Sequence, residues 1–170
     1  KEQLEFLENN KIDMCGTAAQ QFGNFKNKKL EVFKNFKDLK TLMIIGNPII
    51  NSTVMIKTSI LKKLKCNENY ISWDFELHSR VILNGYKVYN LNQILLYSRS
   101  HKNQDSKINY HIGINDSLKI SENYFKYQSD IQIYKKYLDK VKYGYSQKIS
   151  YEDYKKSLAV FKRIIHLRNN

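Results

Sequence analysis

The sequence predicts an α/β domain that is followed by a helical C-terminal segment. Up to about residue 106, short apolar runs typical of strands alternate with segments whose apolar residues recur at helical spacing. Beyond that point only the helical pattern continues, over residues 109–143 and 151–167. The chain has 170 residues, of which 42% are hydrophobic, and this suits one compact domain or part of a larger one.

The first elements are predicted to be a helix over residues 1–10 and a strand in "IDMCGT". Residues 18–35 mix aromatic side chains with Lys, Asn and Gly without a sustained period. This predicts a long loop, with a hairpin as the alternative. Asp38 is then expected to N-cap a helix that ends at Gly46.

The central elements follow a similar alternation. "STVMIK" predicts a buried strand, and Thr58 and Ser59 begin a helix that runs through Leu64. From Trp73 onward the apolar residues keep helical spacing until the pair Asn84-Gly85, which predicts a left-handed cap. "YKVYNL" and "QILLYSR" then predict two short strands.

Composition excludes several classes of protein. No stretch has the roughly 18 uncharged apolar residues of a membrane span. Cys15 and Cys66 lie far apart without neighbouring histidines, which indicates reduced, buried packing residues and neither a zinc site nor a disulfide framework. The net charge of +13 comes mostly from Lys, so a solvated surface is the simplest interpretation and an anionic partner is the alternative. No zinc finger, helix-turn-helix or RNA-binding aromatic motif is present, so no nucleic-acid partner is expected.

Four stretches carry a resemblance to a known family. They are "QLEFLENNKIDMCGT", "NPIINSTVMIKTSIL", "WDFELHSRVILNGYKVYNL" and "LLYSRSH", in this order. Together they resemble the second half of the catalytic domain of family 2 glycosyltransferases, the inverting nucleotide-diphospho-sugar transferases of the Rossmann-like GT-A fold. The resemblance covers residues 1–106, which we expect to be the acceptor-side half of such a domain. Residues 107–170 are expected to form a C-terminal extension built as a helical hairpin.

The resemblance implies a chemistry and a set of residues. The family transfers a sugar from a nucleotide-diphosphate sugar to an acceptor hydroxyl, with inversion and with a divalent metal ion, Mn²⁺ or Mg²⁺, beside the diphosphate. A hydroxyl is a poor nucleophile near neutral pH, so a carboxylate must take its proton as the new bond forms. The family's Glu-Asp pair at the start of a helix falls on Trp73 and Asp74, which makes Asp74 the expected general base and Trp73 an expected substrate contact. The match to "YSRSH" makes Arg99 an expected substrate contact and His101 an expected metal ligand.

The sequence also departs from the family's pattern. A strand, an acidic residue for the nucleobase and the Asp-x-Asp motif should precede "QLEFLENN", but the sequence begins there. We therefore expect a fragment, a truncated product or one half of a complex, inactive by itself and with most metal ligands outside this chain. The loop "KCNENYIS" stands where the family has a Gly-Gly pair.

Each candidate residue has a structural alternative. Asp74 in a first helical turn is also favoured by capping and by the helix dipole. Trp73 is alternatively a core anchor, and His101 alternatively a solvated histidine. His78, inside the same helix, is expected to be structural. The Lys and Tyr residues of the tail suit helix packing or, as the alternative, a basic face on an anionic membrane.

Three functions compete at this point. The first is a sugar transferase with a saccharide or lipid-linked acceptor, cytoplasmic or peripheral on the inner membrane face, in polysaccharide assembly of the cell envelope. The second is a non-catalytic glycan-binding or partner-binding remnant of the same fold. The third is a basic nucleic-acid-binding module, whose affinity falls steeply with salt.

Overall fold

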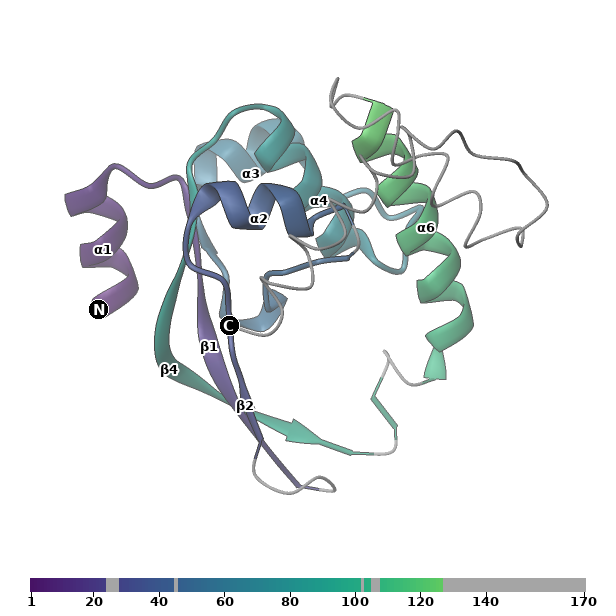
Figure 1. Ribbon diagram of the computed structural model, residues 1–170, viewed down its shortest axis with the longest axis horizontal. Coiled ribbons are helices and arrows are strands. Elements are labelled where there is room, and N and C mark those ends of the chain that lie inside the picture. Colours follow the sequence, from purple (N-terminus) through teal and green to yellow (C-terminus); the bar gives the residue numbers. More distant parts are fainter. Residues whose placement is uncertain (24–27, 45, 102, 105–107, 127–170) are drawn as a thin grey trace, which may run out of the picture. The chain divides into compact units, whose positions relative to one another are not determined.

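The protein is described here by a computed structural model that covers residues 1–23, 28–44, 46–101, 103–104 and 108–126 (Figure 1). The chain divides into two compact units, Lys1–Ser121 and Glu122–Asn170. The predicted domain boundary after residue 106 stays a prediction. The helices and strands are, in chain order, α1 (Glu2–Asn10), β1 (Met14–Gly23), β2 (Lys28–Leu30), α2 (Phe36–Leu42), the 3-10 helix η1 (Asn51–Thr53), β3 (Met55–Ile56), α3 (Thr58–Leu64), α4 (Trp73–Leu83), β4 (Val88–Ser100) and α6 (Tyr110–Lys126).

Strand β1 is the centre of a four-stranded mixed sheet. One edge of β1 pairs along its whole length with β4, in parallel. The other edge pairs antiparallel with β3 at its beginning and with β2 at its end. Every other strand of the sheet therefore depends on β1 for its hydrogen bonds.

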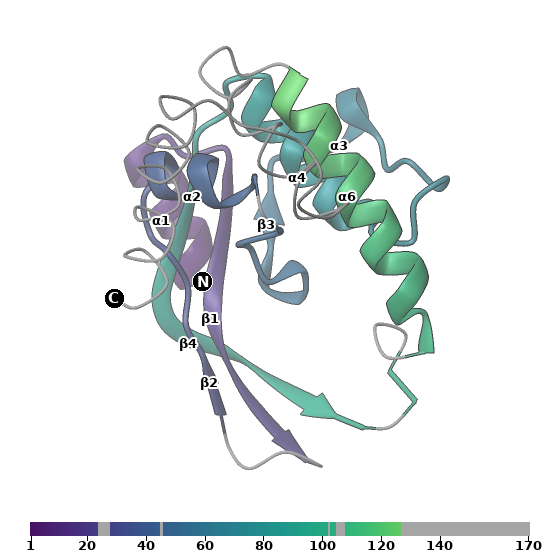
Figure 2. The same ribbon diagram turned by 45° about the vertical axis from the view of Figure 1, so that its right-hand side comes forward.

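Both faces of the sheet are covered where β1 begins. Six consecutive residues of β1, from Met14 to Ala19, are buried, so the strand does not alternate between a wet and a dry face. Helix α1 lies on one side of the sheet, whereas α3 and α4 lie on the other (Figures 1 and 2). On the α1 side, the rings of Phe6 and Tyr89 meet with their centroids 5.0 Å apart. The α/β prediction is confirmed as a mixed α/β arrangement with an open mixed sheet.

The predicted helices are largely confirmed, with two corrections at α2, which ends at Leu42 and not at Gly46. Helices α1, α3 and α4 occupy the predicted segments, and Gly85 ends α4 with a φ of 78°. Asp38, however, does not cap α2. The cap is Asn35, whose Oδ1 accepts a hydrogen bond from the Asp38 N–H at 3.0 Å, because Asn offers both an acceptor and a donor at this position.

The strand predictions need more revision. Residues 18–35 are not a long loop: β1 continues to Gly23 and pairs with β2 as a hairpin, which was the alternative. "YKVYNL" and "QILLYSR" contribute to one long strand, β4. Register shifts in the β1/β4 pairing fall between Thr17 and Ala19, so the polar "NLNQ" break is a bulge and not a turn. "STVMIK" provides only η1 and the two-residue strand β3.

Two further expectations concern single residues and the tail. Cys15 is buried, as predicted, and burial raises the pKa of its thiol. Cys66 is exposed because it lies in the loop after α3, so its prediction as a packing residue is wrong.

The predicted helix over 109–143 is described only as far as Lys126, and the one over 151–167 lies outside the described residues. None of the helices in the described part of the chain is long and apolar enough to cross a bilayer.

Asp13 ties three elements together at the start of the sheet. Its carboxylate accepts hydrogen bonds from Lys57 Nζ at 2.7 Å and from the Lys87 N–H at 2.8 Å. Burial alone raises the pKa of Asp13, but these two donors outweigh it and lower the pKa below the usual value. Asp13 thus joins the beginnings of β1, α3 and β4.

A second set of contacts between distant segments lies in the core, at Asn90 of β4. Asn90 is fully buried, and its Nδ2 donates to the Phe33 carbonyl at 2.9 Å and to the Pro48 carbonyl at 3.5 Å. A Cβ added at Gly16 of β1 would overlap Oδ1 of Asn90. The close approach of β1 to this side chain therefore requires glycine at position 16.

We predict that Gly16→Ala lowers the free energy of unfolding by about 1–3 kcal/mol, because the two hydrogen bonds of Asn90 prevent it from moving aside. Urea unfolding followed by circular dichroism measures this change. The matched control is Gly113→Ala in α6, where the nearest atom to an added Cβ is Ser72 Oγ at 3.7 Å. That variant should be neutral or slightly stabilising. Equal unfolding midpoints for the two variants would contradict the packing argument.

Candidate functional site

Asp74 is the second residue of α4, and its side chain is held by a residue from another part of the chain. The N-cap of α4 is Ser72, whose side chain makes no capping hydrogen bond. The Asp74 carboxylate accepts a hydrogen bond from Nδ2 of Asn47 at 3.2 Å. Its other oxygen, Oδ1, accepts none from the residues that the structure describes. Asp74 is therefore not the capping residue of α4, although its place in the first turn suits the helix dipole.

Asn47 links Asp74 to His78, one turn further along α4. Oδ1 of Asn47 accepts a hydrogen bond from the Ile49 N–H at 3.2 Å and lies 3.3 Å from Nδ1 of His78. Residues four apart share one face of a helix, so the Asn47 amide reaches both α4 side chains. Burial lowers the pKa of His78 to about 4, because a charged imidazole would lose its hydration. His78 is therefore neutral near pH 7.

Asn47 is not among the site residues that the sequence predicts. Its signal in the sequence is the pair Asn47-Pro48, since Asn in a turn commonly folds its side chain over nearby backbone. The contact with Asp74 spans 27 residues, so sequence spacing alone does not reveal it.

The segment that leads into α4 is held by the part of α6 that belongs to the unit Lys1–Ser121 (Figure 2). The Ile71 N–H donates to Oδ2 of Asp116 at 2.7 Å, and the Ser72 hydroxyl donates to the Gly113 carbonyl at 3.4 Å. Asp116 is only 7% exposed. The first part of α6 thus belongs to the surroundings of Asp74.

The remaining predicted site residues fall in two places. Trp73 is adjacent to Asp74 and is 39% exposed, so part of its indole ring is accessible. Arg99 is exposed near the end of β4, where it pairs with Phe22, and His101 is exposed just beyond. The end of β4 lies at the far end of the sheet from α4 (Figures 1 and 2). The structure therefore brings Trp73 and Asp74 together, but not Arg99 and His101 with them.

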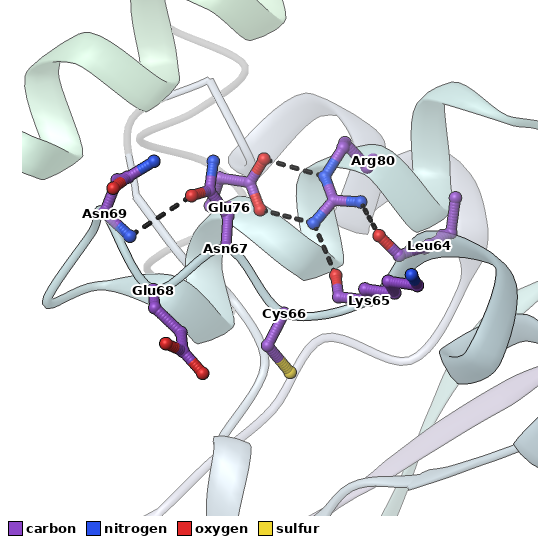
Figure 3. A pocket seen from close by; sticks show the side chains of 8 residues that line it. All are labelled: Leu64, Lys65, Cys66, Asn67, Glu68, Asn69, Glu76 and Arg80. Atoms are coloured by element: carbon purple, nitrogen blue, oxygen red, sulfur yellow. Dashed lines mark hydrogen bonds and ion pairs between the residues drawn. The ribbon is translucent and has the colours of Figure 1, made fainter.

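A pocket of about 570 Å³ opens beside α4, between its outer side and the loop after α3 (Figure 3). Arg80 makes two hydrogen bonds to the Glu76 carboxylate, at 2.7 and 2.6 Å. It also donates to the carbonyls of Leu64 at 2.5 Å and Lys65 at 2.8 Å. These carbonyls end α3 and have no partner within that helix, so Arg80 satisfies them and complements the helix dipole.

Lys65, at the end of α3, has an unusual backbone conformation. Its φ of 58° and ψ of 157° lie in a region that glycine adopts readily and other residues avoid. The hydrogen bond from Arg80 to the Lys65 carbonyl helps to hold this conformation.

The described residues do not by themselves fit a divalent metal centre. Over 1–23, 28–44, 46–101, 103–104 and 108–126, no three His, Cys, Asp or Glu side chains gather closely enough to hold one ion. His101 as a metal ligand stays a prediction that depends on groups outside these residues.

Comparison with known proteins supports a glycosyltransferase relationship in general terms. No protein-family model matches the chain. The chain is similar to an uncharacterized glycosyltransferase of Methanocaldococcus jannaschii, with 33% identity over 105 residues. The match covers 58% of this chain but only 36% of the length of that protein.

We predict that Lys65→Gly raises the free energy of unfolding by about 1 kcal/mol, because it relieves backbone strain of about 1–3 kcal/mol at some cost in chain entropy. Chemical denaturation measures the change. The matched control is Lys62→Gly, within α3, which should be destabilising by about 1 kcal/mol. A loss of stability at position 65 as large as that at position 62 would contradict strain at Lys65.

We predict that stability falls by about 3 kcal/mol between pH 6.5 and pH 4 because of His78. In this window the unfolded chain binds a proton at residue 78 and the folded chain does not, so the free energy of unfolding decreases as the pH decreases. Urea unfolding at pH 7, 5.5 and 4 measures the slope. His78→Gln should flatten it. An unchanged slope in His78→Gln would show that another group causes the acid sensitivity.

Proposed function

We propose that this chain is part of an inverting glycosyltransferase of family 2 and the GT-A fold, in which Asp74 is the general base. The observation that carries the proposal is the state of the Asp74 carboxylate. One oxygen is fixed by Asn47, and the other accepts no hydrogen bond from the described residues. The similarity to a glycosyltransferase supports the reaction class.

In the proposed reaction, an acceptor hydroxyl donates a hydrogen bond to Oδ1 of Asp74. As the hydroxyl oxygen attacks the anomeric carbon, its proton passes to Asp74. The bond from the anomeric carbon to the diphosphate oxygen breaks on the opposite face, and the diphosphate leaves with the bonding electron pair. Attack opposite the leaving group inverts the anomeric configuration.

Trp73 suits a substrate contact in this reaction. An indole ring presents an apolar face that stacks on the C–H face of a sugar. Trp73 is 39% exposed and directly precedes Asp74, so its ring can lie against a sugar whose hydroxyl reaches the carboxylate. It replaces the Glu of the family's pair, which leaves Asp74 without an adjacent acidic neighbour in the chain.

The other components of the reaction are proposed from the family alone. They are a nucleotide-diphosphate sugar donor, a saccharide or lipid-linked acceptor, and a divalent metal ion that neutralises charge on the leaving diphosphate. Arg99 and His101 are assigned to the substrate and the metal on the same basis. A cytoplasmic or membrane-peripheral setting in envelope polysaccharide assembly is part of this proposal.

We predict that Asp74→Asn, in the complete natural protein that carries this sequence, lowers kcat for sugar transfer by about 10²- to 10⁴-fold, because an amide does not take up the hydroxyl proton. Transfer is measured with a panel of UDP-, GDP- and dTDP-linked hexoses, and NMR of the product reports the anomeric configuration. Thermal unfolding should stay close to that of the unsubstituted protein.

The matched control is Asp38→Asn. Asp38 lies in the first turn of α2 and accepts a hydrogen bond from Asn35 Nδ2 at 2.6 Å, so it repeats the local setting of Asp74 away from α4. It should keep full activity. Normal rates in Asp74→Asn would remove Asp74 as the base. Glycan binding by calorimetry, without turnover of any donor, would instead support the non-catalytic alternative.

A further inference from the structure

We propose that Asn47 is a positioning residue that fixes the carboxylate of Asp74 for proton transfer. This inference rests on the proposed function of Asp74. It concerns a side chain that approaches α4 from the turn after α2. Three features of the structure support it: the orientation of the amide, the state of His78 and the anchoring of the turn in the core.

The orientation of the Asn47 amide follows from its neighbour Ile49. A backbone N–H can only donate, so the atom that lies 3.2 Å from the Ile49 nitrogen is the amide oxygen. Nδ2 is then the atom that faces Oδ2 of Asp74, at 3.2 Å. Because Nδ2 can only donate, Oδ2 of Asp74 is the acceptor in this contact, and Oδ1 is left to face the approaching hydroxyl.

His78 supports the same orientation from the helix itself. It is buried and neutral near pH 7, so only one of its ring nitrogens carries hydrogen. Its Nδ1 lies 3.3 Å from Oδ1 of Asn47, an acceptor, so the hydrogen is on Nδ1 and points at that oxygen. Oδ1 thus receives two donors, and both oppose a flip of the amide.

The turn that carries Asn47 is anchored in the core. Ile49 is 3% exposed, and the Pro48 carbonyl accepts a hydrogen bond from the buried Asn90 of β4 at 3.5 Å. The amide is therefore held relative to the sheet, and through it the Asp74 carboxylate is held as well. A base fixed in this way needs little reorganisation as the hydroxyl approaches.

The first test needs no turnover. NMR of the side-chain amide protons of Asn47 at pH 7 should show that Asp74→Asn shifts one Nδ2 proton strongly, because a neutral amide replaces the carboxylate that this proton faces. Asp38→Asn should leave both Nδ2 protons at the shifts of the unsubstituted protein. An Asn47 amide that does not respond to Asp74→Asn would overturn the inference, whatever the fate of the proposed function.

The second test uses sugar transfer in the complete natural protein, with a donor from the hexose panel. Asn47→Ala should lower kcat by about 10- to 100-fold while the KM of the donor changes by less than about 3-fold, because the base is displaced and the donor site is not. Asn47→Asp should move the acidic limb of the pH–rate profile to higher pH, since two adjacent carboxylates ionise less readily. Asn47→Gln, which keeps the amide, should recover part of the rate.

Asn35→Ala is the matched control, because Asn35 makes the same type of contact to Asp38. It should reduce stability through the loss of the α2 cap and leave kcat unchanged. If Asn47→Ala does not fold, as judged by circular dichroism, the pH–rate profile of the nearly isosteric Asn47→Asp tests the inference in its place. An inactive Asp74→Asn beside Asn47 variants with normal kcat and normal pH profile would overturn the inference alone. A fully active Asp74→Asn would overturn the proposed function itself.

Discussion

The pairing of β1 on both of its edges is the constraint on which the rest of the structure depends. Parallel pairing with β4 requires the chain between them to cross back over the sheet, and α2, α3 and α4 are formed from that crossing segment. Asp13 joins β1 to the beginnings of α3 and β4, and the close approach of Gly16 to Asn90 joins the two strands in the core. These contacts determine where α4 begins relative to the sheet.

Helix α4 is held by side chains from three other parts of the chain. Arg80 binds the end of α3, Asn47 reaches Asp74 and His78 from the turn after α2, and Asp116 of α6 holds the residue before the cap. Each contact is polar and directional, so together they restrict rotation as well as translation of the helix. The Asp74 carboxylate in the first turn is therefore held in a defined position.

The surroundings of Asp74 also explain how this sequence departs from the family that it resembles. Trp73 begins α4 and is 39% exposed, so an aromatic side chain is accessible at the start of this helix. In the loop after α3, Lys65 adopts a backbone conformation suited to glycine, and Arg80 stabilises it through the Lys65 carbonyl. The loop thus keeps a glycine-like shape without glycine, at a cost in backbone strain.

The sequence by itself determined the elements whose periodicity or cap is local: α1, α3, α4 with its end at Gly85, and the α/β class. The resemblance of the stretch from Trp73 to a family motif also made Asp74 and Trp73 predicted site residues, and that role stays a prediction. Only the tertiary structure decided that β4 is one bulged strand, because the partner β1 supplies its register. Only the tertiary structure brought Asn47 to Asp74, because this contact spans 27 residues and depends on where the turn after α2 lies relative to α4. Such a contact produces no periodic pattern in the sequence.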